Sequence, residues 1–181
     1  MKRFTALIIQ SSQPVKKMKK PADIVTTTFD SPLGRIRLAA RPQGLCGVWF
    51  EGQRHQADAS AWPTVPDHLL LQQATTQLTQ YFAGQRRQFD MPLDLSAGTA
   101  FQQTVWQALQ SLPCGQTCSY GALSAQLGRP TAVRAVSSAV ARNPLSIIVP
   151  CHRVLGANGA LTGYAGGLDR KAALLKLEGA L

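Results

Sequence analysis

The pattern of hydrophobic and polar positions predicts a small antiparallel sheet in the first half of the chain. Three segments have the strand pattern, being rich in β-branched residues or alternating between apolar and polar ones: 24–29, 35–40 and 45–50. Ser31-Pro32-Leu33-Gly34, between the first two, is typical of a turn. We expect a weaker fourth strand over 88–95 and a loop over the polar segment 51–66, which carries two prolines.

Apolar residues recur at helical spacing in five further segments. The helices are expected over 69–82, 100–110, 121–127, 132–142 and 169–177. Thr99 and Thr131 stand where each can cap the helix that follows it. The apolar segment 147–149 is too short for a helix, and we expect it to be a buried extended run. Asn158-Gly159 marks a tight turn.

The helices expected over 121–127 and 132–142 are separated by Gly128-Arg129-Pro130-Thr131, a spacing that matches a helix-turn-helix. One face of the second helix combines small residues with arginine: Arg134, Ser137, Ser138, Ala141 and Arg142. Such a face can bring its backbone close to a phosphate chain or into a shallow groove. An ordinary surface helix with small residues would give the same pattern.

These elements together predict an α+β protein. We expect a small N-terminal α/β domain with an antiparallel sheet over 23–95, and a mainly helical C-terminal domain with a winged-helix-like helix-turn-helix over 96–181. Residues 1–22 hold six basic residues and no acidic one, and they are expected to form a flexible basic segment.

Charge and composition narrow the class of protein. The chain of 181 residues has a net charge of +10, and residues 97–181 hold seven basic residues against two acidic ones. That half therefore suits a polyanion, although a solvated basic surface is equally compatible. No aliphatic run is long enough to span a bilayer, so no membrane association is expected. Four cysteines show neither a disulfide framework nor zinc-finger spacing: Cys46, Cys114, Cys118 and Cys151. We expect a reduced, cytoplasmic protein without a bound metal.

The segment Pro150-Cys151-His152-Arg153-Val154 carries the most specific chemistry. An ordinary thiol is only a few per cent thiolate at neutral pH, and burial among apolar residues raises its pKa further. A histidine that acts as a base and is oriented by a carboxylate can reverse this and supply a nucleophile. Glu178 is the only glutamate in the C-terminal half and is the natural partner. Taken alone, the pair is more typical of a buried inert cysteine beside a hydrogen-bonded histidine.

The wider order of residues resembles one family of DNA repair proteins. Six features occur in the matching order between about residues 99 and 179: Tyr120, Arg134, Asn143, the segment 150–154, Gly163-Tyr164-Ala165-Gly166-Gly167 and Glu178. This order is similar to that of the O6-alkylguanine-DNA alkyltransferases, also called methylated-DNA–protein-cysteine methyltransferases. The resemblance implies that Cys151 accepts the alkyl group, irreversibly and once per molecule. It also implies binding to duplex DNA and no cofactor.

The resemblance also implies a role for each matched residue. His152 would act on Cys151 through a water, with Glu178 orienting the imidazole, and Tyr120 would protonate the guanine ring nitrogen. The flipped base would be held by Tyr164, the backbone of Ala165 and the carbonyls of Cys151 and Val154. Asn143 would be a hinge between the two helical parts of the site. Arg134 would fill the hole left in the duplex, while the rest of that helix face contacts the DNA: Ala135, Ser137, Ser138 and Arg142.

The sequence departs from the family pattern in three places. Ser137-Ser138 replaces two residues that are often Gly or Ala, and close approach to the groove is expected to survive because serine is also small. Ser146 stands where some members carry proline, so we expect a looser rim that admits alkyl groups larger than methyl. The zinc ligands of some relatives have no match here. The expected substrate is duplex DNA with O6-alkylguanine, with O4-alkylthymine as a second lesion, and the protein is expected to be a monomer.

Two other classes of function remain to be weighed. One is a helix-turn-helix protein, or an alkyltransferase-like lesion binder, that binds DNA without reacting. Related lesion binders lack a cysteine at the acceptor position, so Cys151 favours activity. The other is a cysteine hydrolase, which is disfavoured because no hydrolase signature surrounds Cys151 and a histidine immediately after the nucleophile is not that arrangement.

Overall fold

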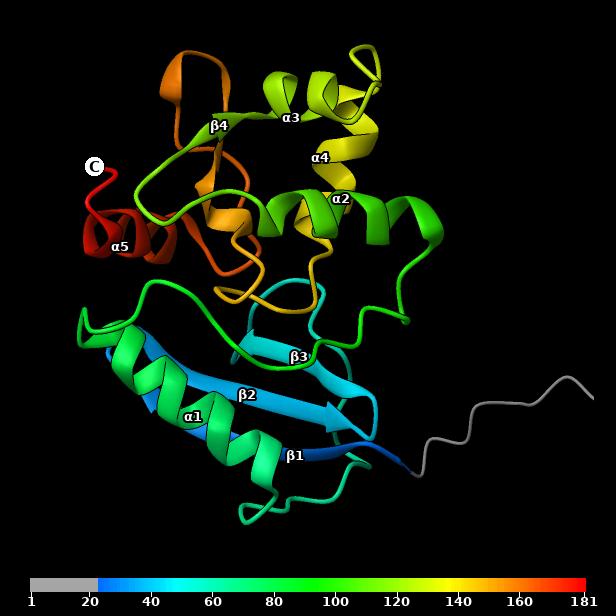
Figure 1. The fold of residues 1–181 in the computed structure, drawn as a ribbon, viewed down its shortest axis with the longest axis vertical. Helices are drawn as coiled ribbons and strands as arrows, with labels where there is room; N and C mark the ends of the chain where they lie inside the picture. The colour runs from blue at the N-terminus through cyan, green and yellow to red at the C-terminus, as the bar shows by residue number, and fades with distance from the viewer. Residues whose placement is uncertain (1–22) are drawn as a thin grey trace, which may run out of the picture.

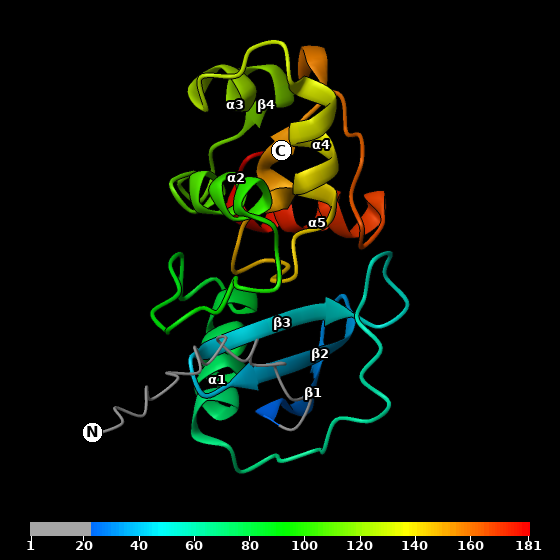
Figure 2. The ribbon, with the colours of Figure 1, turned by 90° about the vertical axis from the view of Figure 1, so that its right-hand side faces the viewer.

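The computed structural model describes residues 23–181 of the chain, so the predicted basic segment 1–22 lies outside the described residues. Figures 1 and 2 show two halves stacked along the longest axis, one built on a sheet and one on short helices. The sheet has the order β1-β2-β3, with β1 (Val25–Ser31), β2 (Gly34–Arg41) and β3 (Gly44–Phe50). Both pairings are antiparallel, and Ser31 pairs with Gly34 across the first turn. The three predicted strands and the turn are confirmed.

The sheet is covered on both faces. Helix α1 (Leu69–Phe82) packs Leu71, Ala74 and Leu78 against one face, where all three are fully buried. On the other face Trp49 meets Trp62, which comes from the predicted loop 51–66, with 6.3 Å between the ring centroids. The apolar side chains of β2 and β3 are therefore buried on whichever face they point to, while Val25 and Phe29 of β1 are half-buried.

The fourth strand predicted over 88–95 is wrong. This segment makes a single bridge to the sheet, between Leu93 and Leu45. Pro92 accepts a hydrogen bond from Leu45 but has no N–H to donate, and the backbone of Asp90 is bonded to the side chain of Gln77 instead. The ladder cannot extend from Leu93 toward residue 88, because the groups that would extend it are absent or engaged.

The second half begins with α2 (Ala100–Gln110), which Thr99 caps as predicted, in a capping box with Gln102. Helices α3 (Tyr120–Gln126) and α4 (Val133–Ala141) form the predicted helix-turn-helix, and α5 (Leu168–Glu178) ends the chain. A two-stranded parallel sheet joins β4 (Cys118–Ser119) to β5 (Val154–Leu155). The predicted α+β fold class is confirmed.

Two local predictions in this half are wrong. Thr131 does not cap α4, because the cap position falls on Ala132, which has no side-chain oxygen to offer. Residues 147–149 are buried but form a turn, not an extended run, and Ile147 has φ +73. A β-branched residue with a positive φ is strained, so its surroundings must hold the turn. Asn143 does so by donating to the Val149 carbonyl at 2.8 Å.

The two halves meet along the segment that follows α4. Val48 of β3 donates to the Pro144 carbonyl at 2.8 Å, and the Ser146 N–H donates to the Val48 carbonyl at 3.0 Å. The sheet thereby continues into the second half through a parallel bridge between Val48 and Leu145. Trp106 of α2 fixes the other side of α4 by donating to the Ala139 carbonyl. No helix within residues 23–181 is long and apolar enough to cross a membrane.

Candidate active site

Cys151 opens the short 3-10 helix η2 (Cys151–Arg153), which lies between the turn after α4 and β5. Its side chain is nearly closed off from solvent, since the residue is 5% exposed. Asn143 donates to the Cys151 sulfur at 3.1 Å with the same amide nitrogen that bonds the Val149 carbonyl. The side chain predicted to be a hinge therefore ties the turn together and hydrogen-bonds the predicted nucleophile.

Burial raises the pKa of the Cys151 thiol, while the Asn143 amide and the charge of Lys171 oppose that rise. A hydrogen bond donated to sulfur stabilises the thiolate over the thiol, because the thiolate is the better acceptor. The Lys171 ammonium is itself fully buried and donates to the carbonyls of Val154 and Thr162, at 2.5 and 2.7 Å. Burial lowers its pKa to about 8.

His152 is fully buried and faces the C-terminal end of α5. Its Nε2 lies 2.9 Å from Oε1 of Glu178, and its Nδ1 is buried without a hydrogen-bond partner among the described residues. Burial lowers the pKa of His152, because the imidazolium is the form that loses hydration, while the Glu178 carboxylate raises it. The structure thus brings together the Cys-His-Glu set that the sequence singled out.

Glu178 is the centre of a buried polar cluster, which we call the Glu178 cluster: Tyr81, His152, Arg153 and Glu178. Arg153 binds both carboxylate oxygens, through Nε at 2.8 Å and Nη2 at 2.9 Å, and Tyr81 of α1 donates to Oε1 at 2.7 Å. Burial alone would raise the pKa of Glu178, but the donors from His152 and Arg153 outweigh it and hold that pKa well below its usual range. The carboxylate is charged and fixed in orientation.

Two tyrosines lie close enough to Cys151 to interact with it electrostatically. Tyr120 begins α3, and its hydroxyl donates to the Gly163 carbonyl at 3.1 Å. Burial, followed by the charges of Cys151 and Cys118, raises the pKa of Tyr120 to about 12, so it holds a proton at neutral pH. Gly163 has φ +51, and a Cβ there would come within 3.3 Å of the Tyr120 hydroxyl. The buried hydroxyl of Tyr164 has no hydrogen-bond partner among residues 23–181, and burial raises its pKa as well.

The two carbonyls predicted to hold a base, those of Cys151 and Val154, already carry one bond each. The Val154 carbonyl accepts from Lys171, and the Cys151 carbonyl accepts from the Val154 N–H. The Ala165 carbonyl accepts from the Arg54 N–H at 3.1 Å. A carbonyl oxygen has two lone pairs, so the first two can each accept a second donor.

Ser146 is turned toward the first half of the molecule. Its hydroxyl donates to Oε1 of Gln53 at 3.2 Å, and the residue is 2% exposed.

The DNA-contacting residues predicted on α4 form one surface, which we call the α4 face: Arg134, Ala135, Ser137, Ser138 and Arg142. All are exposed except the half-buried Ser137, whose hydroxyl donates to the Val133 carbonyl, whereas Val136, Ala139 and Val140 are buried on the opposite side. Neither Arg134 nor Arg142 pairs with any residue in the described part of the chain. The face presents two unneutralised positive charges between small residues.

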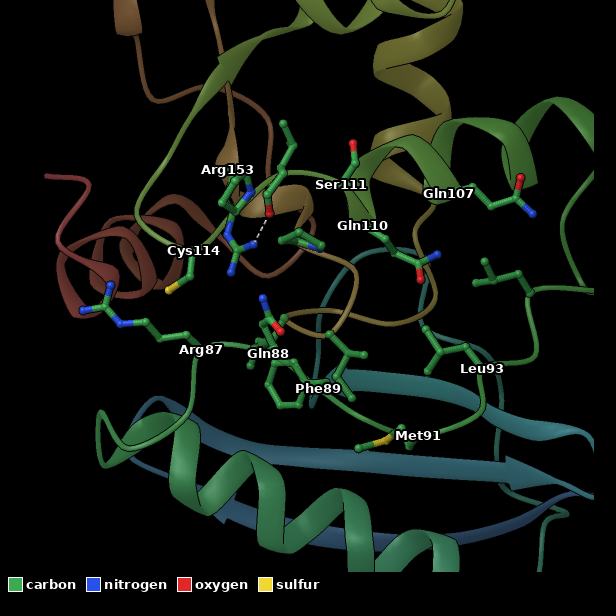
Figure 3. Close-up of a pocket in the computed structure, with 16 residues that line it drawn as sticks. Arg87, Gln88, Phe89, Met91, Leu93, Gln107, Gln110, Ser111, Cys114 and Arg153 are labelled. Atoms are coloured by element: carbon green, nitrogen blue, oxygen red, sulfur yellow. Dashed lines mark hydrogen bonds between the residues drawn. The ribbon is translucent and has the colours of Figure 1, made fainter.

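A cavity of about 890 Å³ lies between the two halves, and Arg153 and Cys114 are among the residues that line it. Figure 3 shows Phe89, Met91 and Leu93 along its floor and Gln107 and Gln110 above. Cys151, Tyr120 and Tyr164 do not line this cavity. Among residues 23–181, no three His, Cys, Asp or Glu side chains cluster as metal ligands.

Both halves match descriptions of one protein family. Residues 24–95 match "6-O-methylguanine DNA methyltransferase, ribonuclease-like domain", and residues 100–180 match "6-O-methylguanine DNA methyltransferase, DNA binding domain". The chain belongs to the 6-O-methylguanine DNA methyltransferase family. The resemblance seen in the motifs is thereby confirmed over nearly the whole described chain.

Curated relatives in this family carry the name methylated-DNA–protein-cysteine methyltransferase. The one from Mycobacterium tuberculosis is 48% identical over 151 residues, which cover 83% of this chain and 90% of the relative. The one from Salmonella typhimurium is 57% identical over 105 residues, 58% of this chain and 61% of the relative.

Solved structures of the family have the same fold. The crystal structure of Mycobacterium tuberculosis OGT in complex with DNA matches with a TM-score of 0.78 and 46% identity, over 87% of this chain and 92% of that one. The methyltransferase of Pyrococcus kodakaraensis matches with a TM-score of 0.62 at 24% identity, which shows that the fold is shared.

Three site residues were missed by sequence reasoning. Arg153 stood within the family's cysteine motif, but nothing in the local pattern shows that it turns inward to a carboxylate. Lys171 had a usable signal, because it lies on the apolar side of its helix, at helical spacing from Leu174, Leu175 and Glu178. Tyr81 had none, since it lies 97 residues from the glutamate it contacts.

Proposed function

We propose the residue roles by which this chain, a DNA repair alkyltransferase of the family above, moves an alkyl group from the O6 of guanine in DNA to its own Cys151. The observation that supports this assignment is the arrangement around one sulfur. Asn143 donates to the Cys151 thiol, and the adjacent His152 is held by the Glu178 carboxylate.

The transfer is a displacement at the alkyl carbon. The Cys151 sulfur forms a bond to that carbon, the bond between the carbon and O6 breaks, and its electron pair passes to the guanine. The thiol proton leaves through a water to Nδ1 of His152, which is buried and has no hydrogen-bond partner among the described residues. Glu178 stabilises the imidazolium that results. The product is a thioether, so each molecule reacts once.

Tyr120 supplies the proton that the leaving guanine needs. Its pKa, raised to about 12, keeps the hydroxyl protonated, and a positioned phenol can neutralise charge as it develops on the ring nitrogen. The hydroxyl now donates to the Gly163 carbonyl, so it must exchange that partner for the base. Because Cys151 is 5% exposed, entry of the base must also displace side chains that cover the sulfur.

The wall of the base site is assigned to Tyr164, the Ala165 backbone and the second lone pairs of the Cys151 and Val154 carbonyls. A purine bound there would stack on the tyrosine ring and donate its amino group to the carbonyls. Gly163 leaves room for the base because it lacks a Cβ.

The α4 face is assigned to the duplex. Small residues allow the helix to approach closely, and Arg134 replaces the stacking that is lost when the nucleotide turns outward, a step that costs a few kcal/mol. DNA itself is the ligand in the complex of the Mycobacterium tuberculosis relative. We further propose that the protein acts as a monomer in the cytoplasm, that O4-alkylthymine is a second substrate, and that Ser146 admits alkyl groups larger than methyl.

The decisive experiment is the intact mass of the protein after incubation with duplex DNA that carries O6-methylguanine. We expect one added methyl group, mapped to Cys151 and absent in Cys151→Ala. Cys118→Ala is the matched control and should still gain the methyl group. Sustained multiple turnover, or methylation elsewhere in the wild type, would contradict the assignment.

A further inference from the structure

One polar atom from the sheet half of the molecule lies in the Glu178 cluster. Tyr81 lies near the end of α1, is 2% exposed, and donates through its hydroxyl to Oε1 of Glu178 at 2.7 Å. That oxygen is also the one that lies 2.9 Å from Nε2 of His152. The tyrosine and the histidine therefore share a single acceptor atom, although they come from different halves.

A shared acceptor couples its donors, which on Oε1 also include Nη2 of Arg153 at 2.9 Å. The carboxylate oxygen that accepts a proton from Tyr81 has less charge to offer His152, so the tyrosine weakens the hold of Glu178 on an imidazolium. It also limits rotation of the carboxylate, whose other oxygen accepts from Nε of Arg153 at 2.8 Å. The direction and basicity of the imidazole thus depend on the hydroxyl of Tyr81.

The ring of Tyr81 has a separate, structural task. It packs edge-on against Phe82, with 5.4 Å between ring centroids, and at 5.5 Å from Phe89. These contacts pack the ring against other residues of the first half and need no hydroxyl. A phenylalanine would keep them, so an oxygen at this buried position has to be explained by what it bonds.

We propose that Tyr81 is a positioning residue for alkyl transfer, by which the N-terminal half sets the orientation and basicity of His152 through Glu178. This inference rests on the proposed roles of His152 and Glu178. The groups that face Glu178 from every packed element are Tyr81 from α1, Cys114 and the Gly115 N–H from the loop before β4, His152 and Arg153 from η2, Tyr164 from the loop before α5, and Lys171, which acts through His152, from α5 itself. Of these, only Tyr81 belongs to the N-terminal half.

The test is the rate of methyl transfer from duplex DNA under single-turnover conditions, measured from pH 5 to 9 with Tyr81→Phe in the full chain. We expect the rate at pH 7 to fall about fivefold, because the Glu178 carboxylate, and with it the imidazole of His152, is then held less firmly in orientation. We also expect the acid limb of the profile, the fall in rate toward low pH, to shift by roughly half a unit to higher pH. The reason is that a carboxylate that has lost one donor holds the imidazolium proton more tightly.

Gln77→Leu is the matched control. Gln77 lies one turn before Tyr81 on the same helix, is 6% exposed, and makes two hydrogen bonds to the backbone of Asp90, away from Glu178. It should lower the melting temperature at least as much as Tyr81→Phe and leave the acid limb in place. If both variants move the limb equally, Tyr81 acts only through stability and the inference is wrong.

A double-mutant cycle separates this inference from the function on which it rests. Glu178→Gln should slow transfer about 100-fold, and adding Tyr81→Phe to it should change the rate by less than about twofold, because the tyrosine then has no carboxylate through which to act. If Glu178→Gln transfers at the wild-type rate, the assigned role of Glu178 fails. If it is slow while Tyr81→Phe alone keeps the wild-type rate and profile, only the role of Tyr81 fails.

Discussion

Two arginines of the C-terminal half show how differently the same side chain is used. Arg153 is 5% exposed and binds both oxygens of Glu178, whereas Arg134 stands exposed on the α4 face with no partner in the described chain. One charge is neutralised within the protein and the other is left for a ligand. The Glu178 cluster is completed by folding, whereas the α4 face, in the role proposed for it, is completed by DNA.

The contrast follows from hydration. A buried charge without a partner costs several kcal/mol, so the cluster must satisfy every charge internally, and its geometry is set before substrate arrives. An exposed arginine keeps its water and costs nothing to leave unpaired. It can then release that water and the counterions of DNA when a duplex binds.

The same substitution in the two regions tests the comparison most strongly. Arg153→Met leaves the buried Glu178 carboxylate without its bidentate partner, and we expect the free energy of unfolding to fall by about 3–5 kcal/mol. Arg134→Met should change it by less than about 0.5 kcal/mol. Urea denaturation at pH 7 measures both. Equal losses would mean that the two sites are not distinguished by burial.

Acid should weaken the cluster in the wild-type protein. The folded-state pKa values of Glu178 and His152 both lie below their ordinary values, so their contribution to stability is present at high pH and is lost as pH falls. The loss should begin below about pH 6.5, the ordinary pKa of histidine, and deepen below about 4.3, that of glutamate. Urea midpoints at pH 7, 5 and 4 measure it. In Glu178→Gln the step below about 4.3 should shrink, and an unchanged step would assign it to other carboxylates.

Arg134→Ala should separate duplex repair from chemistry. We expect methyl transfer from duplex DNA to slow about tenfold, equivalent to about 1.4 kcal/mol, while transfer from a free-base pseudosubstrate is unchanged, because only the duplex requires a nucleotide to be flipped. Single-turnover rates on both substrates provide the measurement. Equal slowing on both would remove Arg134 from the flipping role.

Ser138→Glu probes the small residues of the α4 face with the smallest expected effect. Ser138 is exposed, so stability should stay within about 0.5 kcal/mol of the wild type. A carboxylate held against phosphates should weaken duplex binding several-fold at low salt, and the difference should shrink as salt is raised. Fluorescence anisotropy with labelled duplex at two salt concentrations tests this, with Ser138→Ala as the neutral control. If glutamate and alanine bind equally, this part of α4 does not contact the backbone of DNA.

Local elements were predictable because local spacing governs them. Alternation over 35–40 and the helical period over 69–82 depend on residues a few positions apart, and both predictions hold in the fold. The strand predicted over 88–95 is wrong because Gln77 and Pro92 decide the hydrogen bonds of that segment, and strand propensity cannot show that competition. The helix cap predicted at Thr131 is wrong because α4 begins one residue later than the pattern suggested.

The sequence by itself determined the order of the elements, the cysteine motif and the small-residue face of α4, since each depends on side chains that are near neighbours along the chain. Only the tertiary structure decided that Tyr81 and Arg153 both bind the carboxylate of Glu178. It also decided that Asn143 reaches the sulfur of Cys151. The tyrosine and the glutamate lie 97 positions apart. Their contact depends on how α1 and α5 pack across the boundary between the halves, and burial then makes each unsatisfied polar atom costly enough to select that one arrangement.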